Sequence, residues 1–261
     1  MGKMATVLRR GMAAAILMAA PFTALAVPAG PGSEGSSGQS PEGFRFSAPN
    51  GSVGLRLGYL LASANSDIYD FITDQLTVEK GDFNTPVFAF DVGWNVSERV
   101  ELVGGVEYGR ASKRSEYRDF VDQDDIPIVQ DTRLTQVPLT LSTRFYVTPR
   151  GRSVGQFAWV PSATAFYVGG GIGATWYRLE QAGEFIDFRD LAIFEDVFIS
   201  DGWTFSAHAL AGLDIKLGRS IGLVLEGRYQ FASHDLTGSF VGFDPIDLDG
   251  LRLMAGVSFK F

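Results

Sequence analysis

The stretch Leu-Arg-Leu-Met-Ala-Gly-Val-Ser-Phe-Lys-Phe, residues 251–261, alternates apolar and polar side chains. Its odd positions are all apolar, while its even positions include Arg252, Ser258 and Lys260. Successive side chains of a β-strand point to opposite faces, so one face of this strand is apolar and the other carries charge. An apolar face against hydrocarbon and a charged face toward a closed interior would satisfy both sets of side chains. The stretch therefore predicts a strand of a membrane-spanning barrel.

The same period of two recurs upstream, in segments near residues 52–62, 85–96, 99–110, 133–147, 163–178, 202–217 and 220–232. Each segment is long enough to cross a bilayer as a tilted strand of about 9–11 residues. Closure of the sheet removes open edges, whose unpaired backbone groups would each cost several kcal/mol in lipid. We therefore predict an all-β fold, an eight-stranded antiparallel up-and-down transmembrane β-barrel over residues 50–261.

The connections alternate between short and long, which is typical of bacterial outer-membrane barrels. Ser97-Glu98 and Gly218-Arg219 are short turns, and the link near 148–161 is a longer exception on the same side. We expect long polar loops near 62–84, 111–132, 179–201 and 233–249. The third of these also contains many apolar residues, which suggests a packed cap or a strand extension above the membrane.

These loops are acidic, and carboxylate oxygens could hold Ca²⁺ or Mg²⁺. None of them has the complete EF-hand pattern. A solvated acidic surface is the simpler interpretation, and divalent bridging to anionic lipopolysaccharide is the alternative. We predict no metal site and no cofactor.

The N-terminal residues predict export. Lys3, Arg9 and Arg10 precede an apolar run from Gly11 to Phe22, and Ala24-Leu25-Ala26 is a small-x-small cleavage site. This pattern favours a signal peptide over residues 1–26, with a membrane anchor helix as the alternative. Residues 27–49 are rich in Gly, Ser and Pro, which predicts a flexible linker.

Charge excludes one large class of partner. The chain has a net charge of −8, and cleavage of the three basic residues of the signal segment would leave −11. Nucleic acid binding needs basic patches for the phosphates, so we expect no nucleic acid partner. The chain has no cysteine, so an exported fold would be stable without disulfides.

Strand periodicity divides the membrane segments into an inward and an outward set. The inward set predicts a charge network that fills the lumen, because eight strands enclose a space just wide enough for side chains. Its predicted members are Arg56, Asp91, Glu101, Glu107, Arg144, Asp214, Lys216, Glu226, Arg228, Arg252 and Lys260. The outward set predicts interfacial aromatic girdles. Their predicted members are Tyr59, Phe88, Trp94, Tyr108, Phe145, Trp176, Trp203 and Tyr229.

Three motifs suggest chemistry that we do not predict. Ser206, His208 and Asp214 share a strand face, and a packed lumen histidine is the simpler interpretation than a catalytic set. Ser233-His234-Asp235 loosely resembles the dyad of lipid-modifying outer-membrane barrels, but adjacent residues point to opposite faces. The Gly-rich run 169–174 matches a dinucleotide motif only formally, because no helix pattern follows it. We predict no catalytic residues.

The whole pattern resembles outer-membrane β-barrels of the OmpA/OmpX/opacity type. This resemblance implies localisation in the outer membrane, contact with lipid and lipopolysaccharide, and Phe259 and Phe261 as part of a signal for the barrel-insertion machinery. It also implies a surface-interaction or envelope-integrity role, with an unidentified surface ligand. A narrow small-solute channel and a lipid-modifying enzyme are alternatives. A soluble lipocalin-like barrel is disfavoured, because the charged residues are predicted to face inward and the large apolar ones outward.

Overall fold

The computed structural model describes residues 45–122, 124–154, 158–187, 189 and 192–261. The predicted signal peptide, residues 1–26, and residues 27–44 of the predicted linker lie outside the described residues. Residues 45–49 of that linker contact the barrel end. Arg45 forms an antiparallel bridge with Trp159, so ordered structure begins before the predicted boundary at residue 50.

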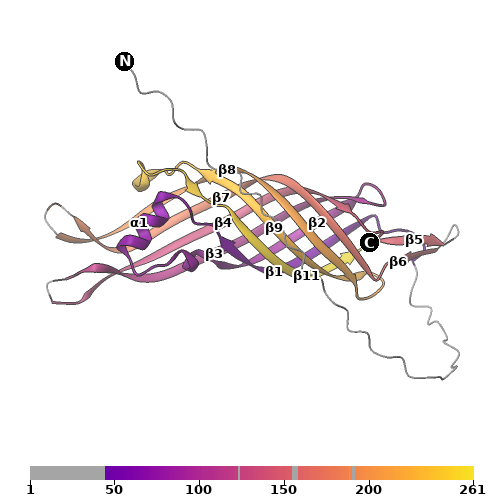
Figure 1. Cartoon of the computed structure of the whole chain (residues 1–261), viewed down its shortest axis with the longest axis horizontal. Coiled ribbons are helices and arrows are strands. Elements are labelled where there is room, and N and C mark those ends of the chain that lie inside the picture. Colours follow the sequence, from indigo (N-terminus) through magenta and orange to yellow (C-terminus); the bar gives the residue numbers. More distant parts are fainter. Residues whose placement is uncertain (1–44, 123, 155–157, 188, 190–191) are drawn as a thin grey trace, which may run out of the picture. The chain divides into compact units, whose positions relative to one another are not determined.

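Eight strands form a closed antiparallel ring (Figure 1), in the order β1-β2-β3-β4-β7-β8-β9-β11. Their bounds are Gly51–Ala62 for β1, Thr85–Asn95 for β2, Val100–Val121 for β3, Pro127–Tyr146 for β4, Thr164–Asp187 for β7, Ala192–Lys216 for β8, Ile221–His234 for β9 and Gly250–Lys260 for β11. The first and last strands close the ring, with Leu57 opposite Ala255. The predicted eight-stranded antiparallel up-and-down barrel is confirmed.

The alternation of side chains sets what faces inward. Along β4 the inward side chains are buried and mainly polar, as at Tyr146, Arg144, Ser142 and Gln136, whereas Leu134 on the same face is apolar. The outward side chains between them include exposed Phe145, Leu141 and Leu139. Large apolar side chains are exposed in the same way around the ring, which is the reverse of a water-soluble barrel. The exterior of the barrel is therefore matched to hydrocarbon.

Two hairpins are much longer than predicted. Residues 111–132 and most of 179–201, which the sequence suggested as long polar loops, continue β3 into β4 and β7 into β8. Apolar and charged residues are mixed there without strict alternation; Glu195 and Asp196 stand between Phe194 and Val197. The expectation of loops was wrong because acidic charge was taken to mark irregular backbone, whereas strands in water carry charge readily. The alternative of a strand extension holds for the third loop.

The other connections contain short elements. The first long loop holds helix α1 (Asp67–Gln75) and the 3-10 turn η2 (Lys80–Phe83), and the fourth holds η3 (Gly238–Phe240) and β10 (Ile246–Asp247). At the short-turn end, β5 (Gly151–Val154) and β6 (Ala158–Pro161) form a small hairpin. Among the described residues, no helix combines the length and apolarity needed to cross a membrane.

The outward facing of Leu141 on β4 leads to a testable prediction. Its side chain is exposed, and on β4 it lies midway between the outward residues Phe145 and Val137. Leu141→Arg should destabilise the folded barrel in lipid vesicles by about 2–4 kcal/mol, because it places a charge near the bilayer midplane. Urea unfolding followed by tryptophan fluorescence measures the change. Val121→Arg, at the end of the projecting β3, is the control and should change stability little; equal effects would contradict the assigned facing.

Candidate functional site: filled lumen, apolar cap and free sheet edge

Glu226 on β9 is the centre of the lumen network. Its Oε1 lies 2.6 Å from Arg56 Nη1 and 2.9 Å from Arg228 Nη2, and its Oε2 lies 2.9 Å from Arg144 Nη2. The hydroxyl of Tyr167 donates a hydrogen bond to the same Oε2 over 2.9 Å. One carboxylate therefore joins cations from β1, β4 and β9. Such a shared anion reduces the cost of burying three guanidinium groups away from water.

Two further carboxylates extend the network along the lumen. Toward the short-turn end, Glu101 Oε2 accepts hydrogen bonds from the Tyr146 hydroxyl at 2.9 Å and from Arg144 at 3.4 Å. Toward the long-loop end, Glu107 pairs with the Nε atom of Arg252. The Nη2 atom of Arg252 donates a hydrogen bond to Gln136 Oε1 at 3.1 Å. Asp91 pairs with the Arg56 guanidinium. Each arginine of the network thus has a carboxylate partner.

The structure brings most of the predicted lumen residues together. All of them are buried except Lys216 and Lys260. Lys260 reaches Asp214 near the short-turn end. Lys216 lies close by at the same end, half-buried, and lines a crevice with Asp214 and Lys260 without joining the ion pairs of the described residues. Strand parity placed Lys216 inward, but its position at the last residue of β8 leaves it outside the closed part of the barrel.

The space that the network leaves is small. A cavity of about 30 Å³ lies next to Glu101, Arg144, Tyr167 and Lys260. This is enough for about one water molecule, not for a solute. Within the described ranges, Asp214 Oδ1 and Ser258 Oγ at its edge have no hydrogen-bond partner, and such buried polar atoms usually bind ordered water.

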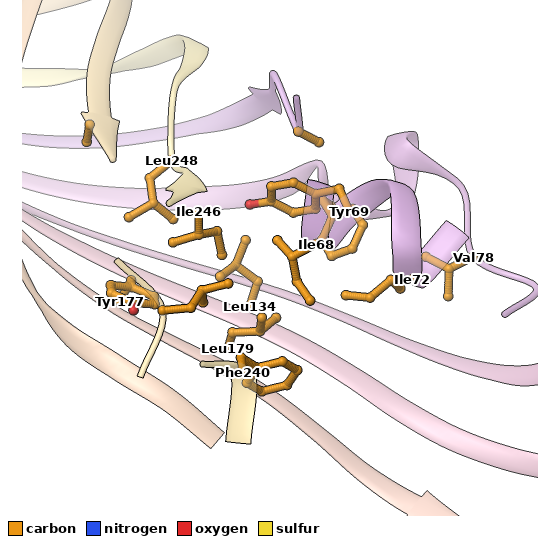
Figure 2. Close-up of a cluster of buried hydrophobic side chains, with 14 of the residues drawn as sticks. Ile68, Tyr69, Ile72, Val78, Leu134, Tyr177, Leu179, Phe240, Ile246 and Leu248 are labelled. Atoms are coloured by element: carbon orange, nitrogen blue, oxygen red, sulfur yellow. The ribbon is translucent and has the colours of Figure 1, made fainter. Parts of the chain in front are cut away.

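An apolar cap closes the long-loop end of the lumen (Figure 2). Ile68, Tyr69 and Ile72 of α1 contact Ile246 and Leu248 of the fourth loop. The strands below contribute Leu134, Tyr177 and Leu179, and η3 contributes Phe240. The sequence analysis missed this cap. The signal for it was the spacing of Ile68, Tyr69 and Ile72, which places three apolar side chains on one face of a short helix.

Hydrogen bonds fix the cap to its neighbours. The Tyr69 hydroxyl donates to the backbone oxygen of Asp247 over 2.7 Å, and burial, together with the Asp247 carboxylate, raises the pKa of Tyr69 well above its ordinary value. At η2, the Glu79 N–H and the Lys113 ammonium both donate to the Asp82 carboxylate. The backbone hydrogen bond, followed by the contact with Lys113, holds the pKa of Asp82 below its usual range. The first and fourth loops are thus both parts of the folded cap.

The projecting sheet, formed by β3, β4, β7 and β8 beyond the barrel, has two edges. On the β3 edge, pairing with β2 ends at Gly109, and beyond it an isolated bridge joins Tyr117 to Leu76. The other edge is β8. Beyond the membrane segment, β8 remains paired with β7 as far as Ala192, but it pairs with β9 only over Ser206–Lys216. Thr237 covers part of the gap, because its hydroxyl donates to the Asp201 oxygen over 3.3 Å. Val197 donates its N–H to the Asp196 Oδ1 atom at 2.7 Å. Hydrogen-bonded pairs alternate along the ladder of β8 with β7, and Lys216, which donates to the Ala163 oxygen, belongs to them. By this alternation Val197 directs its N–H to the open side.

The residues considered for catalysis lie in the lumen and at the long-loop end of β9. His208 Nε2 lies 2.7 Å from Ser142 Oγ, and Ser206 Oγ and His208 Nδ1 are buried without a partner in the described part of the chain. Asp214 instead pairs with Lys260 at the short-turn end. His234 Nδ1 lies 3.2 Å from the Tyr177 hydroxyl, while Ser233 is paired with Asp247 in β10.

Two other predicted features can be placed. Residues 169–174 lie in the middle of β7, with no helix after them. The predicted girdle residues all point outward, although Trp176 and Tyr229 are only half-exposed. In the described residues, no three His, Asp or Glu side chains are grouped closely enough to hold a metal ion.

The chain is similar to several solved barrel structures, whereas no family model and no curated protein matches it. Neisserial surface protein A is 12% identical with a TM-score of 0.45, and the match covers 82% of this chain and 99% of that one. The N-terminal β-barrel domain of OprF from Pseudomonas aeruginosa is 14% identical with a TM-score of 0.34, covering 82% and 100%. Outer membrane protein W of E. coli is 14% identical with a TM-score of 0.39, covering 82% and 98%. The resemblance to barrels of the OmpA/OmpX/opacity type implied an eight-stranded barrel, and the strand pairing shows this fold.

The position of Glu226 among three arginines leads to a prediction about its contribution to stability. Glu226→Gln should destabilise the barrel by about 3–5 kcal/mol, because it removes the anion shared by three buried arginines. Unfolding by urea in vesicles measures the loss. Glu180→Gln breaks the more exposed pair with Arg133 and should cost about 1 kcal/mol or less. A Glu226 variant as stable as the Glu180 variant would contradict the role of Glu226 as the centre of the network.

Proposed function

We propose that the protein is an integral outer-membrane β-barrel that acts at the cell surface through its projecting sheet. Three observations support this proposal: an apolar exterior around the ring, a lumen filled by ion pairs and closed by the cap, and a sheet edge that lacks a neighbour. The third carries the functional part, because an unpaired strand edge is a ready template for another extended chain.

The two ends of the barrel suggest its orientation. Short turns face the periplasm and long connections face the exterior in bacterial barrels. The hairpins β3–β4 and β7–β8 and the cap would then lie outside the cell. Their acidic, solvated surface suits this location, where water and cations are available.

The filled lumen favours a surface role over a channel. The arginine and carboxylate side chains meet across the middle of the barrel, and the cavity beside Glu101 and Arg144 has a volume of about 30 Å³. Hydrated ions need a continuous path of water, which such a space does not provide. The channel alternative would need the cap and the network to move together.

The free edge also indicates the chemistry of its partner. Ile193 and Val197 are exposed on this edge, and Glu195 and Asp196 stand between them. A second copy paired antiparallel to the same edge would oppose like charges, which is destabilising. The edge therefore fits an extended partner segment in which apolar residues alternate with Lys or Arg.

Conductance tests the filled lumen. The full-length barrel reconstituted in a planar bilayer should give no stepwise ion current at moderate voltage, because the ion pairs leave no continuous water path. A known porin in the same bilayer serves as the positive control. Steady current steps from the purified barrel would show that the lumen is open.

Val197→Pro tests the edge. Proline removes the N–H that points to the open side but leaves the pairing of β8 with β7, because Val197 is not among the alternate residues of β8 that donate to β7. A synthetic strand-forming peptide of alternating valine and lysine is the probe. Fluorescence anisotropy should show at least tenfold weaker binding to the Val197→Pro barrel than to the unaltered one.

Val197→Thr is the matched control, because threonine keeps both the N–H and a β-branched side chain. Its affinity for the peptide should stay within about twofold of the unaltered barrel. If the proline and threonine variants bind the peptide equally well, the edge is not the contact surface.

A further inference from the structure

The short-turn end of the barrel is basic, in contrast to the acidic long-loop end. Near this end, the acidic side chains among the described residues are Glu98, which is exposed, and Glu101 and Asp214, which are buried in the lumen. The basic side chains at this end are Arg45, Arg99, Arg150, Arg152, Lys216, Arg219 and Lys260. Of these, Lys260 belongs to the lumen network through its pair with Asp214.

Two of these cations are held by contacts within the barrel end, and four others are distinguished by their exposure. Arg150 donates to the backbone oxygens of Ser97, at 2.6 Å, and Glu98, at 3.0 Å, and so holds two turns together. Lys260 is paired with Asp214. Arg99, Arg152 and Arg219 are exposed and Lys216 is half-exposed. We call these four residues, Arg99, Arg152, Lys216 and Arg219, the basic rim.

The basic rim lies where the apolar exterior ends. Val96 and Leu217 are exposed at 69% and 62%, and each stands in the same short turn as a rim residue, Arg99 and Arg219 respectively. Val154, near Arg152, is exposed as well. Aliphatic side chains beside cations mark the level of lipid headgroups, since Lys and Arg keep their stems in oil and their charges in the interface.

A groove with a volume of about 360 Å³ lies beside two residues of the basic rim, Arg99 and Arg152. It is lined by Arg99, Arg150 and Arg152, with Trp159 and Glu98 also contributing. Guanidinium groups bind phosphate oxygens in a bidentate manner, and tryptophan favours the membrane interface. The groove is therefore suited to a phosphate ester that is attached to acyl chains.

We propose that the basic rim binds anionic phospholipid headgroups of the leaflet at the short-turn end, with phosphatidylglycerol as the representative lipid. The inference rests on the proposed insertion of the barrel in a membrane. An anionic cell-wall polymer would meet the same charges, but it would gain nothing from the exposed Val96 and Leu217. The combination of cation and aliphatic side chains at one level favours the lipid.

Native mass spectrometry of the folded, detergent-solubilised barrel tests this proposal. The protein is mixed with equal amounts of phosphatidylglycerol and phosphatidylcholine, and the bound lipids are counted. We expect at least threefold more phosphatidylglycerol than phosphatidylcholine on the unaltered barrel. The excess should fall as ionic strength rises, because salt screens the exposed charges.

Two matched variants locate the binding. The rim variant changes four residues to Gln: Arg99, Arg152, Lys216 and Arg219. The control variant removes the same number of exposed cations at the opposite end: Lys80, Arg110, Arg114 and Arg189. The rim variant should retain the two lipids equally, and the control variant should keep the excess. Heat-dependent gel migration verifies that each variant is folded, and the salt dependence of the unaltered barrel keeps the test valid if a variant does not fold.

Three results would overturn the proposal: equal retention of the two lipids by the unaltered barrel, an excess that survives in a folded rim variant, or the same loss in both variants. Sedimentation with purified peptidoglycan sacculi provides the competing outcome. Binding to sacculi that the rim variant loses, without a lipid preference, would assign the rim to the cell wall instead. Failure to retain either lipid, together with solubility without detergent, would contradict membrane insertion itself rather than the role of the rim.

Discussion

The backbone hydrogen bonds of the closed ring are the constraint on which the rest of the structure depends. Hydrocarbon supplies no partner for an N–H or C=O group, so each strand in the membrane must be paired on both sides. The chain meets this requirement by pairing β1 with β11, and β8 with β9, across the part of β8 from Ser206 to Lys216. Beyond that part the requirement ends. There β8 is paired on one side only, which water can tolerate.

Closure of eight strands also determines what the interior must be. The enclosed space admits side chains and little else, so the polar inward residues must bond to one another. Four buried arginines and the carboxylates of Asp91, Glu101, Glu107 and Glu226 do so, and tyrosine hydroxyls complete the coordination of Glu101 and Glu226. The interior charges nearly cancel, while the charge of the two ends differs in sign. The net charge of the protein therefore resides on its surfaces.

Most of the fold could be predicted from the sequence. A barrel strand has a period of two, and the alternation of apolar and polar residues is clear in the sequence of each membrane segment. All eight segments, the facing of Arg252 and Glu226, and the outward girdle residues follow from parity alone. The ends of β3, β4, β7 and β8 did not follow, because a strand in water has no polarity requirement that separates it from a loop. The cap also escaped prediction, since it depends on contacts between α1 and residues near Ile246 that are far apart in the chain.

The ion pairs of the lumen join segments that are far apart in the chain. Arg252 and Glu107 are separated by 145 positions, and Glu226 and Arg144 by 82. A half-formed sheet would expose these side chains to acyl chains before their counterions arrive. Intermediates of insertion are therefore high in free energy, and stability is gained only when the first and last strands meet. Because these contacts are long-range, the closure of the ring and the pairing of the buried charges depend on each other.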